Sequence, residues 1–260
     1  MKKTISIIAF TLFANVIFAC TTFSFSDKNG NIVFGRNYDF PIGVGHIHIN
    51  KRNMRKTAFI RPPEKPLEWI SKYGSITFNQ NGKEFPYGGM NEAGLVIEQM
   101  WLQETVYPQL DERYGLSELQ WIQYQLDISE SVKDVINSDS LVRISFTSMS
   151  PLHFLVSDAE GNVATIEYID GKMIVHRDSN LPYPVLANCS YEHSLNYKVS
   201  IDKKENKQFN DWTLNSSGRF AKAVSLIEKY TDDKSIVDYS FEILYSVAKK
   251  NGTQWTNVYD

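Results

Sequence analysis

Small or polar residues alternate with apolar residues over much of this chain, which is the pattern of half-buried β-strands. The first such stretch, residues 21–26 (TTFSFS), is followed by the turn sequence DKNG and by a second apolar run at residues 32–34. This combination predicts a β-hairpin. Because its two strands have similar lengths, we expect Arg36 and Asp39, just past the second strand, to lie near Cys20 at the start of the first.

Further strands and helices follow in alternating blocks. The same alternation predicts strands at residues 46–50, 57–60, 75–78, 95–97, 153–156, 164–168, 172–176, 184–188 and 253–259. Apolar residues at helical spacing, or a capping serine at position 129, predict helices at residues 116–126, 129–136, 218–230 and 235–249. Strands, helices, strands and helices in this order predict an α+β layered sandwich, with Trp121 and Tyr124 in its core.

A glycine-rich segment, FPYGGMNEAGL, precedes the predicted strand at residues 95–97. Gly88, Gly89 and Gly94 tolerate a positive φ that other residues resist, so we expect a turn here. Asn91 lies within this segment and is interpreted as a residue that stabilises the turn.

The first 19 residues have the order of a secretory signal. Lys2 and Lys3 precede an apolar run at residues 5–18, and the small residue Ala19 ends it. The run is shorter than a membrane span of about 20 residues. We therefore expect removal of residues 1–19, export to the periplasm or the medium, and a mature chain, residues 20–260, that folds as one domain.

Composition excludes several classes of function. The net charge is −3 and lysine and arginine form no cluster, so nucleic acid is not an expected partner. Two cysteines make neither a disulfide scaffold nor a CxxC metal site. His46 and His48 alternate on a predicted strand without Cys, Asp or Glu partners, which favours an exposed strand face over a zinc site. We expect no metal or cofactor.

Cys20 admits three interpretations. If cleavage follows Ala19, Cys20 carries both a thiol and a free α-amine whose pKa is about 7.7 to 8.0, which is a nucleophile and a base in one residue. The sequence IFAC at residues 17–20 is also a loose lipoprotein box, in which the thiol would be acylated and the amine blocked. In the third, Cys20 is structural, with or without a disulfide to Cys189.

Five motifs together resemble a known family. Cys20 with its hairpin is followed by GRNYDF, GGMNEAGL, PVLANCS and SSGRFAKA, which extend the similarity to about Ala223. In this order they resemble the N-terminal-nucleophile (Ntn) amidases of the choloylglycine hydrolase type, which include conjugated bile acid hydrolases and penicillin V acylases. The resemblance implies a four-layer αββα fold of two antiparallel sheets flanked by helices.

The resemblance also implies catalytic roles for five residues. Cys20 would be the nucleophile, Arg36 and Asp39 its immediate partners, Asn188 an oxyanion donor and Arg219 a second charged support. Asp39 can hold the α-ammonium or thiol, and both arginines would favour the thiolate. Cys189, next to the oxyanion donor, would then point to the opposite face of its strand as a free buried thiol.

The sequence departs from the family pattern at three places. Trp101 replaces the asparagine of bile acid hydrolases and the tyrosine of penicillin V acylases, so it would form an apolar wall for the acyl group, together with Phe40. The chain lacks the long insertion through which the tetrameric bile acid hydrolases assemble, so we do not expect a tetramer. Another homo-oligomeric state stays open. The chain stops at TQWTNVYD, where relatives continue through about another strand, so it is truncated or closes its sheet differently.

These observations predict an exported cysteine amidohydrolase that cleaves a linear C–N amide bond through a Cys20 acyl-enzyme. Its substrate would be a small N-acyl amide: a conjugated bile acid, an aryl-acyl amide of the penicillin V type, or a long-chain N-acyl amide. Trp69 and Tyr107 would add apolar surface to the acyl pocket. Two alternatives stay open: a lipid-anchored binding protein acylated at Cys20, and an acyltransferase on the same scaffold.

Overall fold

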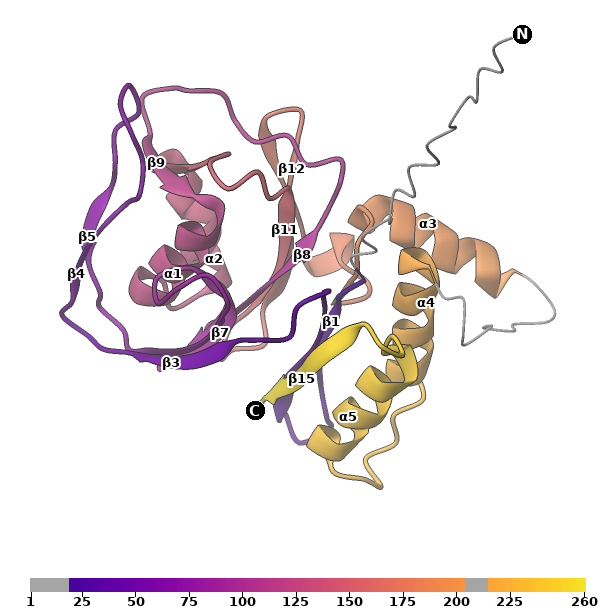
Figure 1. The fold of residues 1–260 in the computed structure, drawn as a ribbon. Coiled ribbons are helices and arrows are strands. Elements are labelled where there is room, and N and C mark those ends of the chain that lie inside the picture. Colours follow the sequence, from indigo (N-terminus) through magenta and orange to yellow (C-terminus); the bar gives the residue numbers. More distant parts are fainter. Residues whose placement is uncertain (1–18, 204–214) are drawn as a thin grey trace, which may run out of the picture.

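Two antiparallel sheets, each covered by helices on its outer face, make up the fold (Figure 1). The structure is a computed structural model that describes residues 19–203 and 215–260. The expected leader, except Ala19, lies outside the described residues, as do residues 204–214. The four-layer αββα arrangement predicted from the sequence is confirmed.

The smaller sheet is built around the predicted hairpin. Its strand order is β14-β1-β2-β15, with β1 (Thr21–Ser26) and β2 (Ile32–Asp39) at the centre, and β14 (Val185–Leu186) and β15 (Thr253–Tyr259) at the edges. All three pairings are antiparallel. The first and last strands of the described chain therefore belong to one sheet, with β2 between them, as the indigo and yellow strands of Figure 1 show.

The larger sheet has the strand order β13-β12-β11-β8-β7-β6-β3. Its strands, all antiparallel to their neighbours, are β3 (His46–Asn50), β6 (Ser75–Asn79), β7 (Pro86–Asn91), β8 (Val96–Trp101), β11 (Leu152–Ser157), β12 (Val163–Ile169) and β13 (Lys172–Arg177). Two short pairs lie outside both sheets: β4 (Arg55–Thr57) with β5 (Glu68–Ile70), and β9 (Tyr114–Ser117) with β10 (Val142–Ser145).

The helices cover the outer faces of the two sheets. On the larger sheet lie α1 (Glu118–Ile128) and α2 (Val132–Asn137), and Trp121 and Tyr124 are buried there as predicted. On the smaller sheet lie α4 (Ser216–Ile227) and α5 (Ile236–Val247), with α3 (Tyr191–Asp202) packed against α4. Between the sheets, residues such as Phe34, Met100 and Leu155 form a second buried core.

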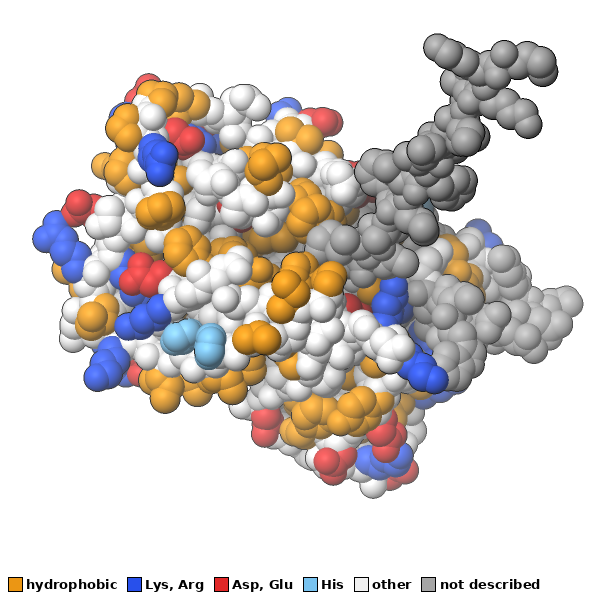
Figure 2. All heavy atoms as spheres, viewed as in Figure 1, with side chains coloured by type: hydrophobic (Ala, Val, Ile, Leu, Met, Phe, Trp, Pro, Cys, Tyr) orange, Lys and Arg blue, Asp and Glu red, His pale blue; other side chains and the backbone are white. Residues whose placement is uncertain are grey.

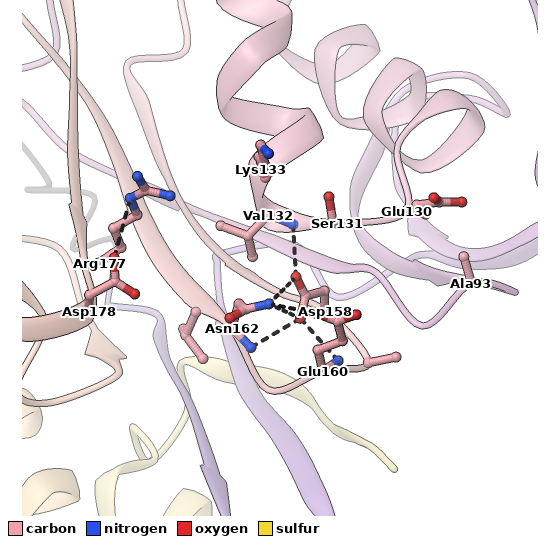
Figure 3. Close-up of a pocket in the computed structure, with 12 residues that line it drawn as sticks. Ala93, Glu130, Ser131, Val132, Lys133, Asp158, Glu160, Asn162, Arg177 and Asp178 are labelled. Carbon is pink, nitrogen blue, oxygen red and sulfur yellow. Dashed lines mark hydrogen bonds and ion pairs between the residues drawn. The ribbon is translucent and has the colours of Figure 1, made fainter.

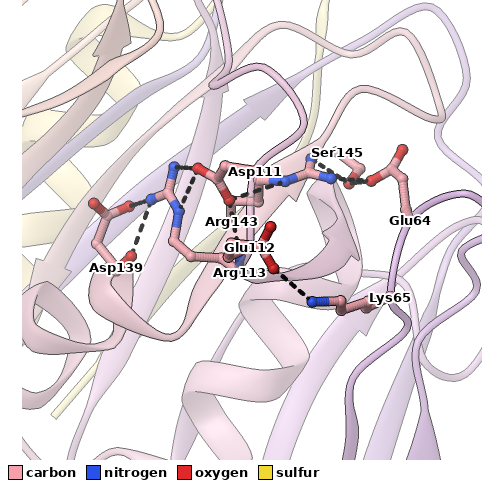
Figure 4. Close-up of polar contacts among 8 residues, drawn as sticks. All are labelled: Glu64, Lys65, Asp111, Glu112, Arg113, Asp139, Arg143 and Ser145. Atoms are coloured by element: carbon pink, nitrogen blue, oxygen red, sulfur yellow. Dashed lines mark hydrogen bonds and ion pairs between the residues drawn. The ribbon is translucent and has the colours of Figure 1, made fainter.

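A charged cluster fixes the loop at residues 61–65 against β9 and β10 (Figure 4). Arg143 is almost fully buried and donates to Glu64 at 2.5 Å and to Ser145 at 2.9 Å. Asp111 bridges Arg143 and Arg113. Because a buried arginine needs partners for its charge, this cluster holds the loop in one position.

The glycine-rich segment was expected to be a turn, but most of it is a strand, and only its end forms a turn. Gly88 and Gly89 belong to β7, and only Gly94 of the three glycines has a positive φ, of 86°. Gly88 is needed for close approach, because a Cβ there would lie 1.9 Å from Oε2 of Glu98. The cap of α2 also differs from expectation: it is Ser131, whereas Ser129 ends α1.

Asn91 has the structural role expected of it. Its amide nitrogen donates to the carbonyls of Leu126 and Ser129, and its amide oxygen accepts from the N–H groups of Ala93 and Leu95. The residue thus ties the end of α1 to the turn between β7 and β8.

Replacement of Asn91 by Ala should lower the free energy of unfolding by about 2 to 4 kcal/mol, since four hydrogen bonds of about 1 kcal/mol are lost and buried groups are left unpaired. Urea denaturation measures this change. Turnover by the fraction that stays folded should be unaffected, so a large fall in kcat of a fully folded variant would contradict the structural role.

Candidate active site

Cys20 lies at the entrance to β1, where the registers of two neighbouring strands converge. In the pairing of β1 with β2, Thr21 is opposite Asn37 and Thr22 is opposite Arg36. In the pairing with β14, Thr22 is opposite Leu186, so two more steps along the same register set Asn188 opposite Cys20. The hairpin predicted from the sequence therefore does return Arg36 and Asp39 to the thiol.

Arg36 is fully buried between the two sheets. Its guanidinium donates to the carbonyl oxygens of Tyr87 and Gln99, each at 3.0 Å, and forms an ion pair with the carboxylate of Glu98. Burial alone disfavours its charged form, but the Glu98 carboxylate raises the pKa of Arg36 above its ordinary value. Arg36 is therefore a permanent cation beside Cys20.

Asp39 has one carboxylate oxygen that is bonded and one that is not. Oδ1 accepts a hydrogen bond from the hydroxyl of Thr253 on β15, whereas Oδ2 is buried and has no hydrogen-bond partner among the described residues. The thiol of Cys20 contacts the backbone oxygen of Asp39 at 3.8 Å. Burial raises the pKa of the Asp39 carboxyl, and the side chains of Thr253 and Arg219 act in the opposite direction. An unbonded buried acceptor beside Cys20 is suited to an ammonium donor.

Arg219 connects Cys20 with Asn188. From α4 its guanidinium donates to the backbone oxygen of Cys20 at 3.3 Å and to Oδ1 of Asn188 at 3.1 Å. The amide nitrogen of Asn188 donates to the carbonyl of Trp101 at 2.9 Å, and its second N–H has no acceptor among the residues that the structure describes. The structure thus brings together all five residues predicted from the sequence, with Arg219 contacting the backbone of Cys20.

Burial raises the pKa of the Cys20 thiol, and it outweighs the Arg36 cation, which lowers it. This differs from the expectation that the two arginines make the thiolate the favoured form. A thiol that is buried and protonated needs a base at hand before it can act as a nucleophile.

A small cavity of about 100 Å³ opens onto Cys20 and Asp39. Phe40 and Trp101, both predicted to bind substrate, line it, and so do further side chains that the sequence did not point to: Tyr38, Tyr87, Gln99, Leu119, Ser150 and Leu152. Trp69 and Tyr107 do not line this cavity; they are buried in the core of the larger sheet. Of the four aromatic residues expected to line an acyl pocket, the cavity therefore contains only Phe40 and Trp101.

Cys189 is a free thiol in the structure, as is Cys20. It is partly exposed and accepts a contact from the hydroxyl of Ser217 at 3.7 Å, so the expected free thiol is present but is less buried than predicted. Among the described residues, no cluster of three or more His, Cys, Asp or Glu side chains could hold a metal ion.

A second hollow, of about 560 Å³, lies beside the turn that joins β11 to β12 (Figure 3). Its central carboxylate, Asp158, accepts hydrogen bonds from the backbone of Val132, Glu160 and Asn162. The charge of Asp158 is thereby used to shape the turn. On the face drawn in Figure 2, basic side chains of the described residues are scattered and form no stripe.

Comparison with known proteins identifies relatives along nearly the whole chain. The family described as "Linear amide C-N hydrolases, choloylglycine hydrolase family" matches residues 20–259. A penicillin V acylase from Pectobacterium atrosepticum is 28% identical over 257 aligned residues, which cover 89% of this chain and 66% of that protein. The chain thus spans slightly less than two thirds of the length of this curated relative.

Solved structures show the same fold. Penicillin V acylase from Agrobacterium tumefaciens superposes with a TM-score of 0.77 at 26% identity, over 92% of this chain and 79% of that one. A single-residue variant of conjugated bile acid hydrolase from Clostridium perfringens gives a TM-score of 0.72 at 18% identity, over 92% of this chain and 85% of that one. The second similarity concerns the fold alone.

Proposed function

The chain belongs to the choloylglycine hydrolase family of linear amide C–N hydrolases, and we propose that it hydrolyses an N-acyl amide through an acyl-enzyme on Cys20. The observation that carries this proposal is the convergence on Cys20 of Arg36 and Asp39 from β2 and of Arg219 from α4. Similarity to penicillin V acylases supports an amide as the substrate.

In the proposed reaction the free α-amine of Cys20 takes the proton of its own thiol. The thiolate attacks the amide carbonyl, and a tetrahedral intermediate forms whose oxygen accepts from the free N–H of Asn188. The C–N bond breaks as the α-ammonium returns its proton to the leaving nitrogen. Water then adds to the thioester, which releases the carboxylic acid and restores the thiol.

The buried Oδ2 of Asp39 supports the role of the amine. An α-ammonium formed during the reaction would donate to this oxygen, which stabilises the protonated amine and holds it beside the thiol. Arg36 stabilises the thiolate by its charge. Arg219 donates to both the backbone oxygen of Cys20 and the side chain of Asn188, and so fixes their positions relative to each other.

The cavity supports an apolar acyl group. Phe40, Trp101 and Leu152 contribute apolar surface beside Cys20. Leu119 lines both this cavity and a larger hollow of about 670 Å³ that includes Phe59 and Phe85. An acyl group too long for the cavity would continue past Leu119, so aryl-acyl, long-chain acyl and bile acid amides all remain candidate substrates.

We further propose that the chain is exported and that cleavage after Ala19 creates the free amine. In the part of the chain that the structure describes, no helix is both long and apolar enough to cross a membrane. Acylation of Cys20 would block the amine and give the lipid-anchored alternative. An acyltransferase would share the acyl-enzyme and replace water by an amine.

Trapping of the acyl-enzyme tests the proposal. The mature protein is mixed with phenoxyacetyl, long-chain acyl and bile acid amides, quenched in acid and analysed by intact mass and peptide mapping. We expect the mass of one acyl group on Cys20 and release of acid and amine in equal amounts. Hydrolysis without any acyl group on Cys20 would contradict the mechanism, and transfer of the acyl group to an added amine in preference to water would indicate the acyltransferase.

A further inference from the structure

A buried histidine and a buried glutamate lie on neighbouring strands of the larger sheet, outside the residues assigned to the reaction. His153 is on β11 and Glu167 is on β12. The register that pairs Phe154 with Ile166 sets these two residues opposite each other one step further along. Their side chains are 0% and 2% exposed, and Nδ1 of His153 lies 3.0 Å from Oε1 of Glu167. Burial of such a pair costs desolvation free energy, which its hydrogen bonds must offset.

The pair contacts both ends of the segment that carries Asn188. At residue 187, the carbonyl oxygen of Ala187 lies 2.7 Å from Nε2 of His153. At residue 191, the backbone N–H of Tyr191 donates to Oε1 of Glu167 at 2.9 Å. Residues 187–190 join β14 to α3, so the pair contacts the first residue of this connection and the first residue of α3, Tyr191. Asn188 lies between the two contacts.

The contacts require a proton between the two side chains. A carbonyl oxygen can only accept, so Nε2 of His153 must carry a hydrogen for the contact with Ala187. Nδ1 then faces Oε1 of Glu167, and that contact is a hydrogen bond only if one of the two atoms is protonated. Without this proton, His153 could donate to Glu167 or to Ala187, but not to both. The protonated pair is neutral as a whole, which suits its burial.

We propose that His153 and Glu167 are positioning residues that fix residues 187–191 and thereby aim the amide of Asn188 at the oxyanion. The inference rests on the proposed function, because it assumes that Asn188 is the oxyanion donor. It explains why a buried polar pair contacts the segment that carries this donor at two points. A displacement of about 1 Å can cost about 10²-fold in rate, so the position of this segment matters for turnover.

Other titratable groups surround the pair. Nδ1 of His176, on β13, lies 4.0 Å from Oε2 of Glu167, and its ring lies 4.9 Å from that of Tyr191. Arg219, on α4, faces the same segment from the other side through Asn188. His176 makes its own hydrogen bond with Thr165 at 3.1 Å. As a neighbouring imidazole without a hydrogen bond to Ala187, His176 provides the matched control.

The test compares Glu167→Gln with His176→Gln. A glutamine at position 167 has nearly the same shape, but it removes the charge that pairs with a protonated His153. We expect kcat for a phenoxyacetyl amide to fall about 10-fold or more, by the sensitivity of rate to misplacement, with KM changed by less than about 2-fold. The rate at which iodoacetamide alkylates Cys20 should stay the same, because it does not depend on the oxyanion donor. His176→Gln should match the wild type in all three measurements.

Two results would overturn the inference. One is an unchanged kcat in folded Glu167→Gln, and the other is a parallel loss of kcat and of Cys20 alkylation, which would indicate general destabilisation. If Glu167→Gln does not fold, nitrogen-15 NMR of the histidine-labelled wild type tests the inference instead, because it shows which ring nitrogens of His153 carry a hydrogen. The inference requires an attached hydrogen on both ring nitrogens of His153, or on Nε2 together with a protonated Glu167; hydrogen on Nδ1 alone would refute it.

Failure of the inference is distinguishable from failure of the proposed function. If Cys20→Ala hydrolyses the amide as fast as the wild type, the proposed function is wrong. If Cys20→Ala is inactive, Asn188→Ala is slow and Glu167→Gln is as fast as the wild type, the proposed function stands and the positioning role is wrong. The NMR measurement needs no substrate and therefore answers even if the correct amide has not been found.

Discussion

A chain that begins at Cys20 should hydrolyse its amide substrate about 10²- to 10⁴-fold faster than the same chain extended by Ala19, because that is the usual contribution of a positioned general base. In the extended chain the nitrogen of Cys20 is part of a peptide bond and cannot accept a proton. The thiol keeps its place but has no base, and burial keeps its pKa above the ordinary value. The thiol alone is then a poor nucleophile at neutral pH.

The surroundings of Ala19 give this prediction its structural reason. Ala19 is fully buried and Cys20 is 4% exposed, so the peptide bond that joins them is buried. Oδ2 of Asp39 lies in the same buried region without a hydrogen-bond partner among the described residues. Removal of Ala19 both frees the amine and provides Asp39 with a charged donor. Asp39→Asn should therefore keep the fold and lose most of the turnover of the mature protein.

The comparison needs proteins with defined N-termini. Intact mass and N-terminal sequencing establish which residue comes first, and a chain with residues 1–19 replaced by Met-Ala provides the extended form. Cys20→Ser in the mature form keeps the amine but removes the thiolate, and it should be nearly inactive. Equal turnover by the mature and extended chains would contradict the role of the amine. A lipid-modified Cys20 in the native protein would contradict it as well.

Much of this site could be predicted from local sequence. The turn DKNG and the similar lengths of the flanking strands were enough to return Arg36 and Asp39 to Cys20, because a hairpin fixes its own register. Asn188 and Arg219 depend on contacts between distant segments. Their place in the site came from the family resemblance, since the alternation predicted a strand at residues 184–188 but not the strand with which it pairs.

What the sequence pattern missed has physical causes. Helix α3 was not predicted because few of its residues are buried, so it lacks a clear apolar stripe. The strand β7 was taken for a turn because its glycines suggested positive φ, whereas Gly88 is needed to admit the side chain of Glu98. Glu98 itself was missed because a glutamate among apolar residues predicts an exposed position, and its buried partner comes from the other sheet.

Replacement of Glu98 should destabilise the protein more than any change of a surface charge. Glu98 and Arg36 have fully buried side chains and form an ion pair that joins β8 to β2. The hydroxyl of Tyr259 donates to Oε1 of Glu98 at 2.5 Å, which brings β15 into the same contact. Burial raises the pKa of Glu98, while Arg36 and Tyr259 act in the opposite direction. Arg36 and Tyr259 thus oppose the effect of burial, which by itself favours the neutral acid.

Glu98→Gln keeps the volume of the side chain but leaves the Arg36 cation without its counter-charge. Breaking a buried pair in this way typically costs about 3 to 5 kcal/mol, so we expect a fall of that size in the free energy of unfolding. Urea denaturation measures it. The control is Glu242→Gln, which breaks the pair with Lys234 at 2.9 Å, where both side chains are about half exposed. That change should have little effect, because solvent screens the pair.

The same variant distinguishes a structural role of Glu98 from an influence on the thiol. In the folded fraction of Glu98→Gln, the positive charge of Arg36 is no longer neutralised and should lower the pKa of Cys20 relative to the wild type. The pH at which iodoacetamide alkylates Cys20 at half its maximal rate should therefore shift downward. An unchanged free energy of unfolding would show that the ion pair does not hold the sheets together. An unchanged alkylation profile would show that the charge of Arg36 does not act on the thiol, and Arg36 would then serve the site only by linking the two sheets.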